Sequence, residues 1–155
     1  MLLPIIALAL AADPIALKVV VIDVSAPDAV YEDVSRALAQ QVVAELLAAG
    51  LEAVRVDENQ LPEEGCRIGP CLGQVAREQK AQVVVILDAT EVDKKSTAVS
   101  LAAMAGRNGM PISAKRYTVK SGKTPKELTD FVAALAKKLS PSPPAADAGR
   151  TDAGR

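Results

Sequence analysis

The side chains best suited to chemistry in this sequence are two cysteines, Cys66 and Cys71, and the chain has no histidine to assist them. Four residues separate the cysteines, whereas a redox-active dithiol typically has the Cys-X-X-Cys spacing. The lack of histidine excludes Ser-His-Asp and Cys-His catalysis, and two cysteines do not complete a four-ligand zinc site. Three alternatives remain for the pair: a structural disulfide, two reduced thiols, or a redox or metal role.

The first residues, MLLPIIALALAAD, are typical of an export signal. Residues 2–10 form an apolar run that suits a signal-peptide core and is too short to span a bilayer. Residues 9–11 fit the small-x-small cleavage rule, so we predict a signal peptide at 1–11 and a bacterial periplasmic or secreted protein without a stable membrane anchor. No lysine or arginine precedes the run. The alternative is therefore a buried strand in a cytosolic protein with free thiols.

The predicted export favours one of the alternatives for the cysteines. In an oxidising compartment two nearby thiols form a disulfide. Closing so short a loop contributes about 2 kcal/mol in the chain-entropy model. We therefore expect a structural disulfide between Cys66 and Cys71.

Two acidic residues form a second possible site, because Asp23 and Asp88 each lie at the end of an apolar run. Proteins of the α/β class often place functional groups at strand ends. Asp88, Glu91 and Asp93 also have the oxygen ligands that suit a divalent cation. The simpler interpretation is solvated turn residues, because the sequence does not bring the acids within the few ångströms that paired-carboxylate catalysis requires. We predict no catalytic residue, no metal site and no cofactor.

Charge is unevenly distributed along a chain whose formal net charge is −1. Residues 1–80 carry 6 basic and 12 acidic side chains, a balance of −6, and residues 81–155 carry 12 basic and 7 acidic, a balance of +5. This balance predicts no attraction to nucleic acid or to an anionic membrane. A basic hairpin with Arg107, Lys115 and Arg116 is a possible partner contact, and loose pairing of these charges within the fold is the alternative.

The elements that position these residues follow from hydrophobic periodicity. Strand-like runs at 15–24, 51–56, 82–88, 97–105 and 112–119 are combined with helical patterns that begin near residues 29, 70 and 125. The predicted order is β-α-β-α-β-β-β-α, which gives an α/β (α+β) fold with a mixed five-stranded sheet and helices packed on it. The run at 82–88 is apolar throughout, so we expect it to be a central strand.

Local signals specify several connections. Asn108 and Gly109 predict a hairpin, because both residues tolerate positive φ. Residues 121–124 read SGKT, like the end of a phosphate-binding loop, but Tyr117 replaces the first glycine of that motif. Thr124 is therefore expected to be the N-cap of the last helix, in a capping box with Glu127.

The ends of the chain differ in composition from its middle. Beyond residue 140 the sequence is rich in proline, alanine and glycine and repeats DAGR, so it cannot bury enough apolar surface to fold. We predict a signal peptide at 1–11, a single α/β domain at 12–139 and a disordered tail at 140–155.

One stretch has a more specific pattern, in which Val56-Asp57 is followed by Cys66, by Cys71-Leu72 and by the apolar run at 83–87. This order resembles exported bacterial domains related to the N-terminal domain of TolB and to the CsgG-like group. The resemblance covers roughly residues 16–139 and implies their fold and a cell-envelope setting, but no catalytic residue. The chain departs from the pattern at Asp88, since a glycine often follows the third strand, and neither a β-propeller nor membrane-inserting segments accompany the domain.

These observations predict a non-catalytic, exported domain that contacts another envelope protein or protein complex. Its contact surfaces are expected to be the basic hairpin and any open sheet edge, which could accept a strand. The alternative is a small-ligand-binding or enzymatic α/β protein that uses the strand ends near Asp23 and Asp88. A polar pocket that joins these two residues would favour the alternative. The sequence does not predict the oligomeric state.

Overall fold

The computed structural model describes residues 17–26, 28–57, 60–62, 66, 69–120 and 125–140. The predicted signal peptide, the tail beyond residue 140 and the segment 121–124 lie outside these residues. The predicted division of the chain into 1–11, 12–139 and 140–155 therefore stays a prediction.

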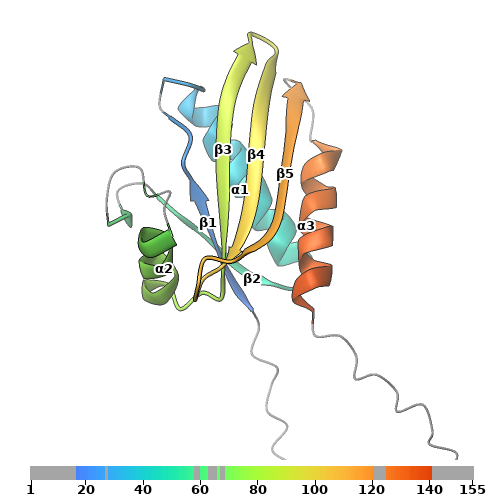
Figure 1. The fold of residues 1–155 in the computed structure, drawn as a ribbon. Coiled ribbons are helices and arrows are strands. Elements are labelled where there is room, and N and C mark those ends of the chain that lie inside the picture. The colour runs from blue at the N-terminus through green and yellow to red at the C-terminus, as the bar shows by residue number, and fades with distance from the viewer. Residues whose placement is uncertain are drawn as a thin grey trace, which may run out of the picture.

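The described chain forms a single five-stranded sheet with three helices packed on it (Figure 1). The elements are β1 (Lys18–Asp23), α1 (Glu32–Ala48), β2 (Glu52–Val56), α2 (Gly69–Glu78), β3 (Val83–Asp93), β4 (Ser96–Ala105), β5 (Pro111–Lys120) and α3 (Lys126–Leu139). The strand order is β2-β1-β3-β4-β5, in which β1 pairs parallel with β2 and β3 while β4 pairs antiparallel with β3 and β5. The predicted fold class and element order are confirmed, and β3 is the central strand.

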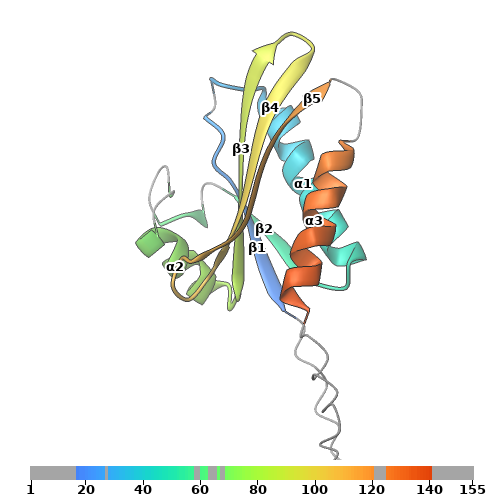
Figure 2. The same cartoon turned by 45° about the vertical axis from the view of Figure 1, so that its right-hand side comes forward.

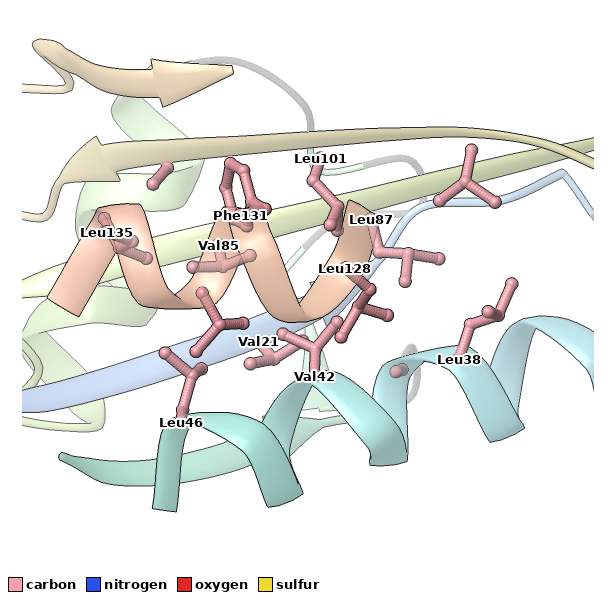
Figure 3. Packing of buried hydrophobic residues seen from close by; sticks show 14 of the residues in the cluster. Val21, Leu38, Val42, Leu46, Val85, Leu87, Leu101, Leu128, Phe131 and Leu135 are labelled. Atoms are coloured by element: carbon pink, nitrogen blue, oxygen red, sulfur yellow. The ribbon is translucent and has the colours of Figure 1, made fainter. Parts of the chain in front are cut away.

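Alternation along the strands divides the core into two layers. One layer lies between the sheet and the helices α1 and α3, and the other lies between the sheet and α2 (Figures 1 and 2). In β1, Val19 and Val21 belong to the first layer, and Val20 and Ile22 belong to the second. The first layer is completed by leucines and a phenylalanine of the two helices, among them Leu38, Leu46, Leu128, Phe131 and Leu135 (Figure 3).

The end of α1 and the start of α3 are capped in different ways. Gly50 takes a φ of +84° after α1, and the N–H groups of Gly50 and Leu51 donate to the carbonyls of Leu47 and Leu46 at 3.0 and 3.1 Å. A glycine in the left-handed region is a common way to end an α-helix. At the start of α3 the N-cap is Pro125, with no side-chain capping bond. The predicted N-cap is thus wrong by one residue, because the helix begins after the proline.

The predicted hairpin between β4 and β5 is present, but only one of its two signal residues has the expected conformation. Gly109 takes a φ of +67°, and Asn108 is not among the described residues with positive φ. The N–H of Gly109 donates to the carbonyl of Ala105 at 2.8 Å, and the side chain of Asn108 accepts from the N–H of Met110 at 3.1 Å. Asn108 therefore supports the turn through its side chain.

The connection between β1 and α1 seals the edge of β3 beyond the last residue of β1. The carbonyl of Leu87 accepts from Val24, the N–H of Ala89 donates to the hydroxyl of Ser25, and the N–H of Glu91 donates to the carbonyl of Ala29. These bonds are 2.8, 2.8 and 2.6 Å long. Unpaired strand edges attract other strands. Since the connection pairs this part of β3, the outer strands of the described sheet are β2 and β5.

Gly106 brings the β4–β5 turn against the end of α2. Its N–H donates to the carbonyl of Gln82 at 2.8 Å. A Cβ atom at this position would lie 2.8 Å from the Cβ of Ala76 and 2.9 Å from the carbonyl oxygen of Ala81. By contrast, a Cβ atom at Gly73 in α2 would meet its nearest neighbours at 3.5 and 3.7 Å, which are ordinary contacts.

We predict that Gly106→Ala lowers the free energy of unfolding by about 1–3 kcal/mol, because either the turn or α2 must move. Gly73→Ala is the matched control and should raise the stability by up to about 1 kcal/mol through helix propensity. Urea unfolding of both variants measures the difference. Equal stability of the two variants would contradict the close approach of the turn to α2.

Candidate functional site

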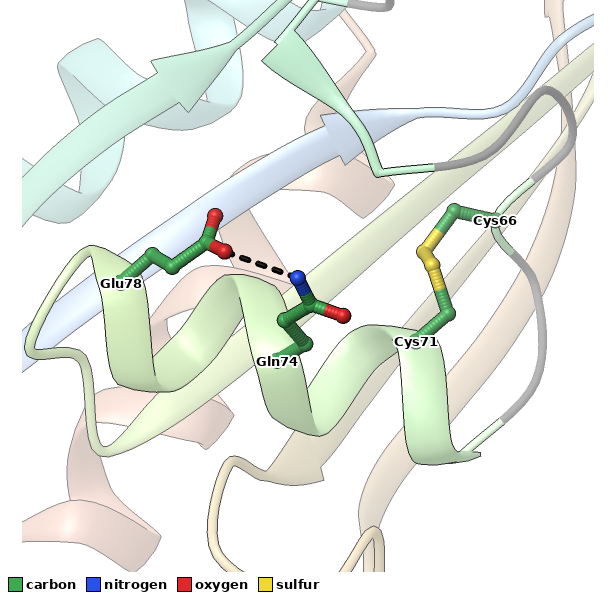
Figure 4. Close-up of a disulfide and its surroundings, with 4 residues drawn as sticks. All are labelled: Cys66, Cys71, Gln74 and Glu78. Carbon is green, nitrogen blue, oxygen red and sulfur yellow. Dashed lines mark hydrogen bonds between the residues drawn. A yellow bond between two sulfur atoms is a disulfide. The ribbon is translucent and has the colours of Figure 1, made fainter.

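Cys66 and Cys71 meet at the start of α2, where the structure joins them in a disulfide (Figure 4). Their Cα atoms are 5.7 Å apart. Cys66 is 2% exposed and Cys71 is 6% exposed, and both belong to the apolar layer beneath α2. This is the bond that the sequence analysis favours. Since a disulfide that exchanges must be reached by a thiolate, the burial of both residues fits a structural bond.

The disulfide attaches the connection after β2 to a short helix. The helix α2 has 10 residues, and helices of this length are marginal without tertiary contacts. Leu72 and Val75 pack inward, while Gln74 on the exposed side donates to Glu78 at 2.9 Å (Figure 4). The apolar face and the disulfide together hold α2 against β1 and β3.

Asp23 and Asp88 lie on opposite faces of the sheet. Asp23 is in register with Leu87, which packs in the layer under α1 and α3. Asp88 is the next residue of β3, so strand alternation directs it to the other face. The Asp23 carboxylate accepts a hydrogen bond from the N–H of Ser25 at 3.0 Å. The two acids therefore do not form the shared pocket that the alternative interpretation requires.

A polar recess of about 260 Å³ does lie beside Asp23, where β1 and β2 end. Its charged groups pair with one another, since Arg36 bonds to Glu32 and Arg55 bonds to Asp57. The recess is thus lined by charges that already have local partners.

A larger cavity of about 490 Å³ opens between the start of α1, the β3–β4 turn, the end of β5 and the start of α3. Val34 and Leu38 contribute apolar walls to this cavity. The charged part of its lining consists of three acids and three lysines, Lys94, Lys95 and Lys120. Tyr31 lines the same cavity and is 73% exposed. This cavity could not be predicted from the sequence, because its residues come from four separate elements and share no local motif.

The basic residues of the predicted contact surface are exposed but are not gathered into one patch. Arg107 lies in the β4–β5 turn, and Lys115 and Arg116 are neighbours in β5, so their side chains leave opposite faces of the sheet. Lys115 is in register with the buried Leu101, on the face of α1 and α3. The guanidinium of Arg116 donates to the hydroxyl of Ser100 at 3.0 Å on the other face.

Among the described residues, no group of three or more cysteines or acids could hold a metal ion. Asp93 instead accepts hydrogen bonds from the Ser96 side chain and from the backbone of Lys95, which lower its pKa. No helix in the described ranges is both long enough and apolar enough to cross a membrane.

Tyr117 is the one buried tyrosine, and its hydroxyl has no hydrogen-bond partner in the described structure. It extends from β5 into the layer under α1 and α3. Burial, together with the negative charge of Glu127, raises the pKa of Tyr117 to about 12. A buried hydroxyl without a partner costs free energy, because it has lost its hydrogen bonds to water.

The described chain is thus a mixed α/β domain in which a βαβαβ unit is continued by an antiparallel hairpin and a last helix. Its fold is similar to that of the PelC dodecamer from Paraburkholderia phytofirmans, with a TM-score of 0.52, 15% identity, and coverage of 82% of this chain and 90% of that chain. Lipoprotein GNA1162 from Neisseria meningitidis matches with a TM-score of 0.51 and 14% identity, over 81% and 96% of the two chains. TolB from Acinetobacter baumannii matches with a TM-score of 0.55 and 12% identity, over 81% of this chain and 28% of TolB.

No protein-family model and no curated protein matches the sequence. At identities of 12–15% the likeness to the solved structures is one of fold. The predicted TolB-like fold is confirmed at that level, for a domain that corresponds to 28% of the TolB chain. The CsgG-like part of the resemblance stays a prediction.

Reduction of the disulfide should lower the free energy of unfolding by about 2 kcal/mol, because the unfolded chain regains the entropy of the closed loop. Urea unfolding with and without reductant measures this loss. A Cys66→Ala, Cys71→Ala double variant should not respond to reductant. Equal stability of the oxidised and reduced wild-type protein would contradict a stabilising bond.

Tyr117→Phe should leave stability at neutral pH unchanged or raise it by about 1 kcal/mol, because it removes an unsatisfied hydroxyl. The folded pKa of about 12 exceeds the ordinary value of 10.0, so the unfolded state loses its proton first as the pH rises. Wild-type stability should therefore fall between pH 10 and 12, relative to the variant. Urea unfolding across this range measures the effect. The exposed Tyr31→Phe serves as the control and should follow the wild-type protein.

Proposed function

We propose that this chain is an exported, non-catalytic domain that acts by contact with another protein or protein complex of the bacterial cell envelope. The observation that carries the proposal is the buried disulfide between Cys66 and Cys71. Disulfides persist in oxidising compartments such as the periplasm. The apolar segment at residues 2–10 supports export independently.

Similarity of fold supports the setting and the mode of action. GNA1162 is named as a lipoprotein, and PelC forms a dodecamer, so copies of PelC contact one another. The domain proposed here would likewise act through its surface. The TolB-like resemblance of the sequence adds the cell-envelope setting.

A non-catalytic role is supported by the positions of the polar groups. The two acids that could have formed a catalytic pair, Asp23 and Asp88, lie on opposite faces of the sheet, and the two cysteines are buried. Nucleophilic and acid–base catalysis require such groups to converge on one reacting atom. The proposed contact surface is the basic outer strand β5 with Arg107 beside it, together with the outer strand β2.

Mass spectrometry of the protein isolated from its native cells tests the proposal. We expect a chain that lacks roughly residues 1–11, and two cysteines that accept an alkylating label only after reduction. Fractionation should recover the protein with periplasmic or secreted markers. An intact Met1 together with two free thiols would refute export.

A further inference from the structure

The starts of α1 and α3 and the turn between β3 and β4 lie at the same end of the molecule (Figures 1 and 2). The cavity of about 490 Å³ opens between them. Its lining takes seven residues from positions 30–41, at the start of α1, but only Pro125 from the start of α3. The helix α3 therefore covers the later turns of α1 and leaves the first turns beside the cavity.

The apolar stripe of α1 continues into this cavity. Leu38, Val42 and Leu46 are buried in the layer under α1 and α3. Towards the start of the helix the stripe reaches Val34, which is 38% exposed, and Tyr31, which is 73% exposed. Spacings of three and four residues place all five side chains on one side of the helix. Two large side chains at the cavity thus remain partly in water, and an apolar ligand would bury them favourably.

Positive groups reach the cavity from two sources. Lys94, Lys95 and Lys120 line it, are exposed, and take part in no ion pair recorded among the described residues. The helices α1 and α3 also begin here, since their N-cap residues Tyr31 and Pro125 belong to the lining and form no side-chain capping bond. The positive ends of both helix dipoles thus lie at the cavity. Together these groups favour an anion.

Two of the three acids in the lining already have partners within the chain. The Asp33 side chain is 97% exposed, and its carboxylate lies 4.0 Å from the guanidinium of Arg36. The Asp93 carboxylate accepts a hydrogen bond from a backbone N–H of its own turn at 2.7 Å and another from the Ser96 side chain. Glu91 is the third acid. The lysines are therefore the larger set of charges that a ligand can meet.

We propose that this cavity binds a small amphipathic carboxylate, a molecule with one anionic head and an apolar chain. The head lies among Lys94, Lys95 and Lys120, and the chain lies against Val34 and Leu38. A volume of about 490 Å³ is within the range of small-molecule sites. The inference goes beyond the proposed function, because it adds a soluble ligand to a domain proposed to act by protein contact.

Isothermal titration of the oxidised full chain with decanoate, kept below its micelle concentration, tests the proposal. Decanoate should bind at one site per chain, and added salt should weaken the binding because it screens exposed charges. Decanol has the same chain without the charge and should bind about tenfold more weakly or less, and decyltrimethylammonium should not bind. In NMR spectra of the same titration, the backbone amide signals of residues that line the cavity should shift.

Two variants test the head and the chain separately. The Lys94→Gln, Lys95→Gln, Lys120→Gln triple variant should weaken decanoate binding by about tenfold, since each exposed ion pair contributes a small share. Val34→Asp should weaken it at least as much, because a carboxylate then faces the apolar chain. Val34 is the third residue of α1, where an acid suits the helix dipole, so the fold is retained. Lys115→Gln is the matched control, an exposed lysine of β5 outside the lining.

Three results would each overturn the proposal: no saturable binding of decanoate, equal binding of decanol, or equal affinity of the triple variant and Lys115→Gln. Amide shifts confined to residues away from the cavity would also overturn it, because they would place the binding elsewhere. Should Val34→Asp not fold, the lysine variants still decide the outcome. The export and thiol results do not depend on this cavity, so the two proposals fail separately.

Discussion

The first half of the central strand must be shielded from water on both faces, and the rest of the fold follows from that constraint. Residues 83–85 of β3 are all buried, and they alternate between the two layers of the core. Both neighbours of β3 in the sheet are other strands. These strands cover the edges of β3 but not its faces, so each face needs a helix. Each helix must belong to a connection that leaves the strand order intact.

Right-handed crossovers supply these helices. The chain moves from β1 outward to β2 through α1, and then back across β1 to β3 through α2. Because the two crossovers run in opposite directions and both are right-handed, their helices lie on opposite faces. The third helix follows β5 and joins α1. This leaves α2 alone on its side, reinforced by the Cys66–Cys71 bond, and β4 and β5 without a helix there.

Much of this arrangement could be predicted from local sequence. The uniformly apolar run that begins β3 indicates a central strand, Gly50 indicates the end of α1, and Asn108-Gly109 indicates the hairpin. The second half of β3 was missed, because residues 88–93 are largely polar and their partners are β4 and the connection after β1. The strand register that places Asp88 beside Ser100, and Ser100 beside Arg116, also could not be predicted. Strand register depends on turn geometry and on a bulge near Glu91, which no local motif specifies.

The first strand begins and the last helix ends at the same end of the sheet (Figure 1). Lys18 accepts a hydrogen bond from the backbone of Gln82 at this end, and Lys138 donates to the carbonyl of Ile112. The start of β1 and the end of α3 therefore lie at one pole of the molecule. The β3–β4 turn, with the larger cavity beside it, forms the opposite pole. Attachment at the start of β1 or at the end of α3 therefore leaves the same far surface open to the surroundings.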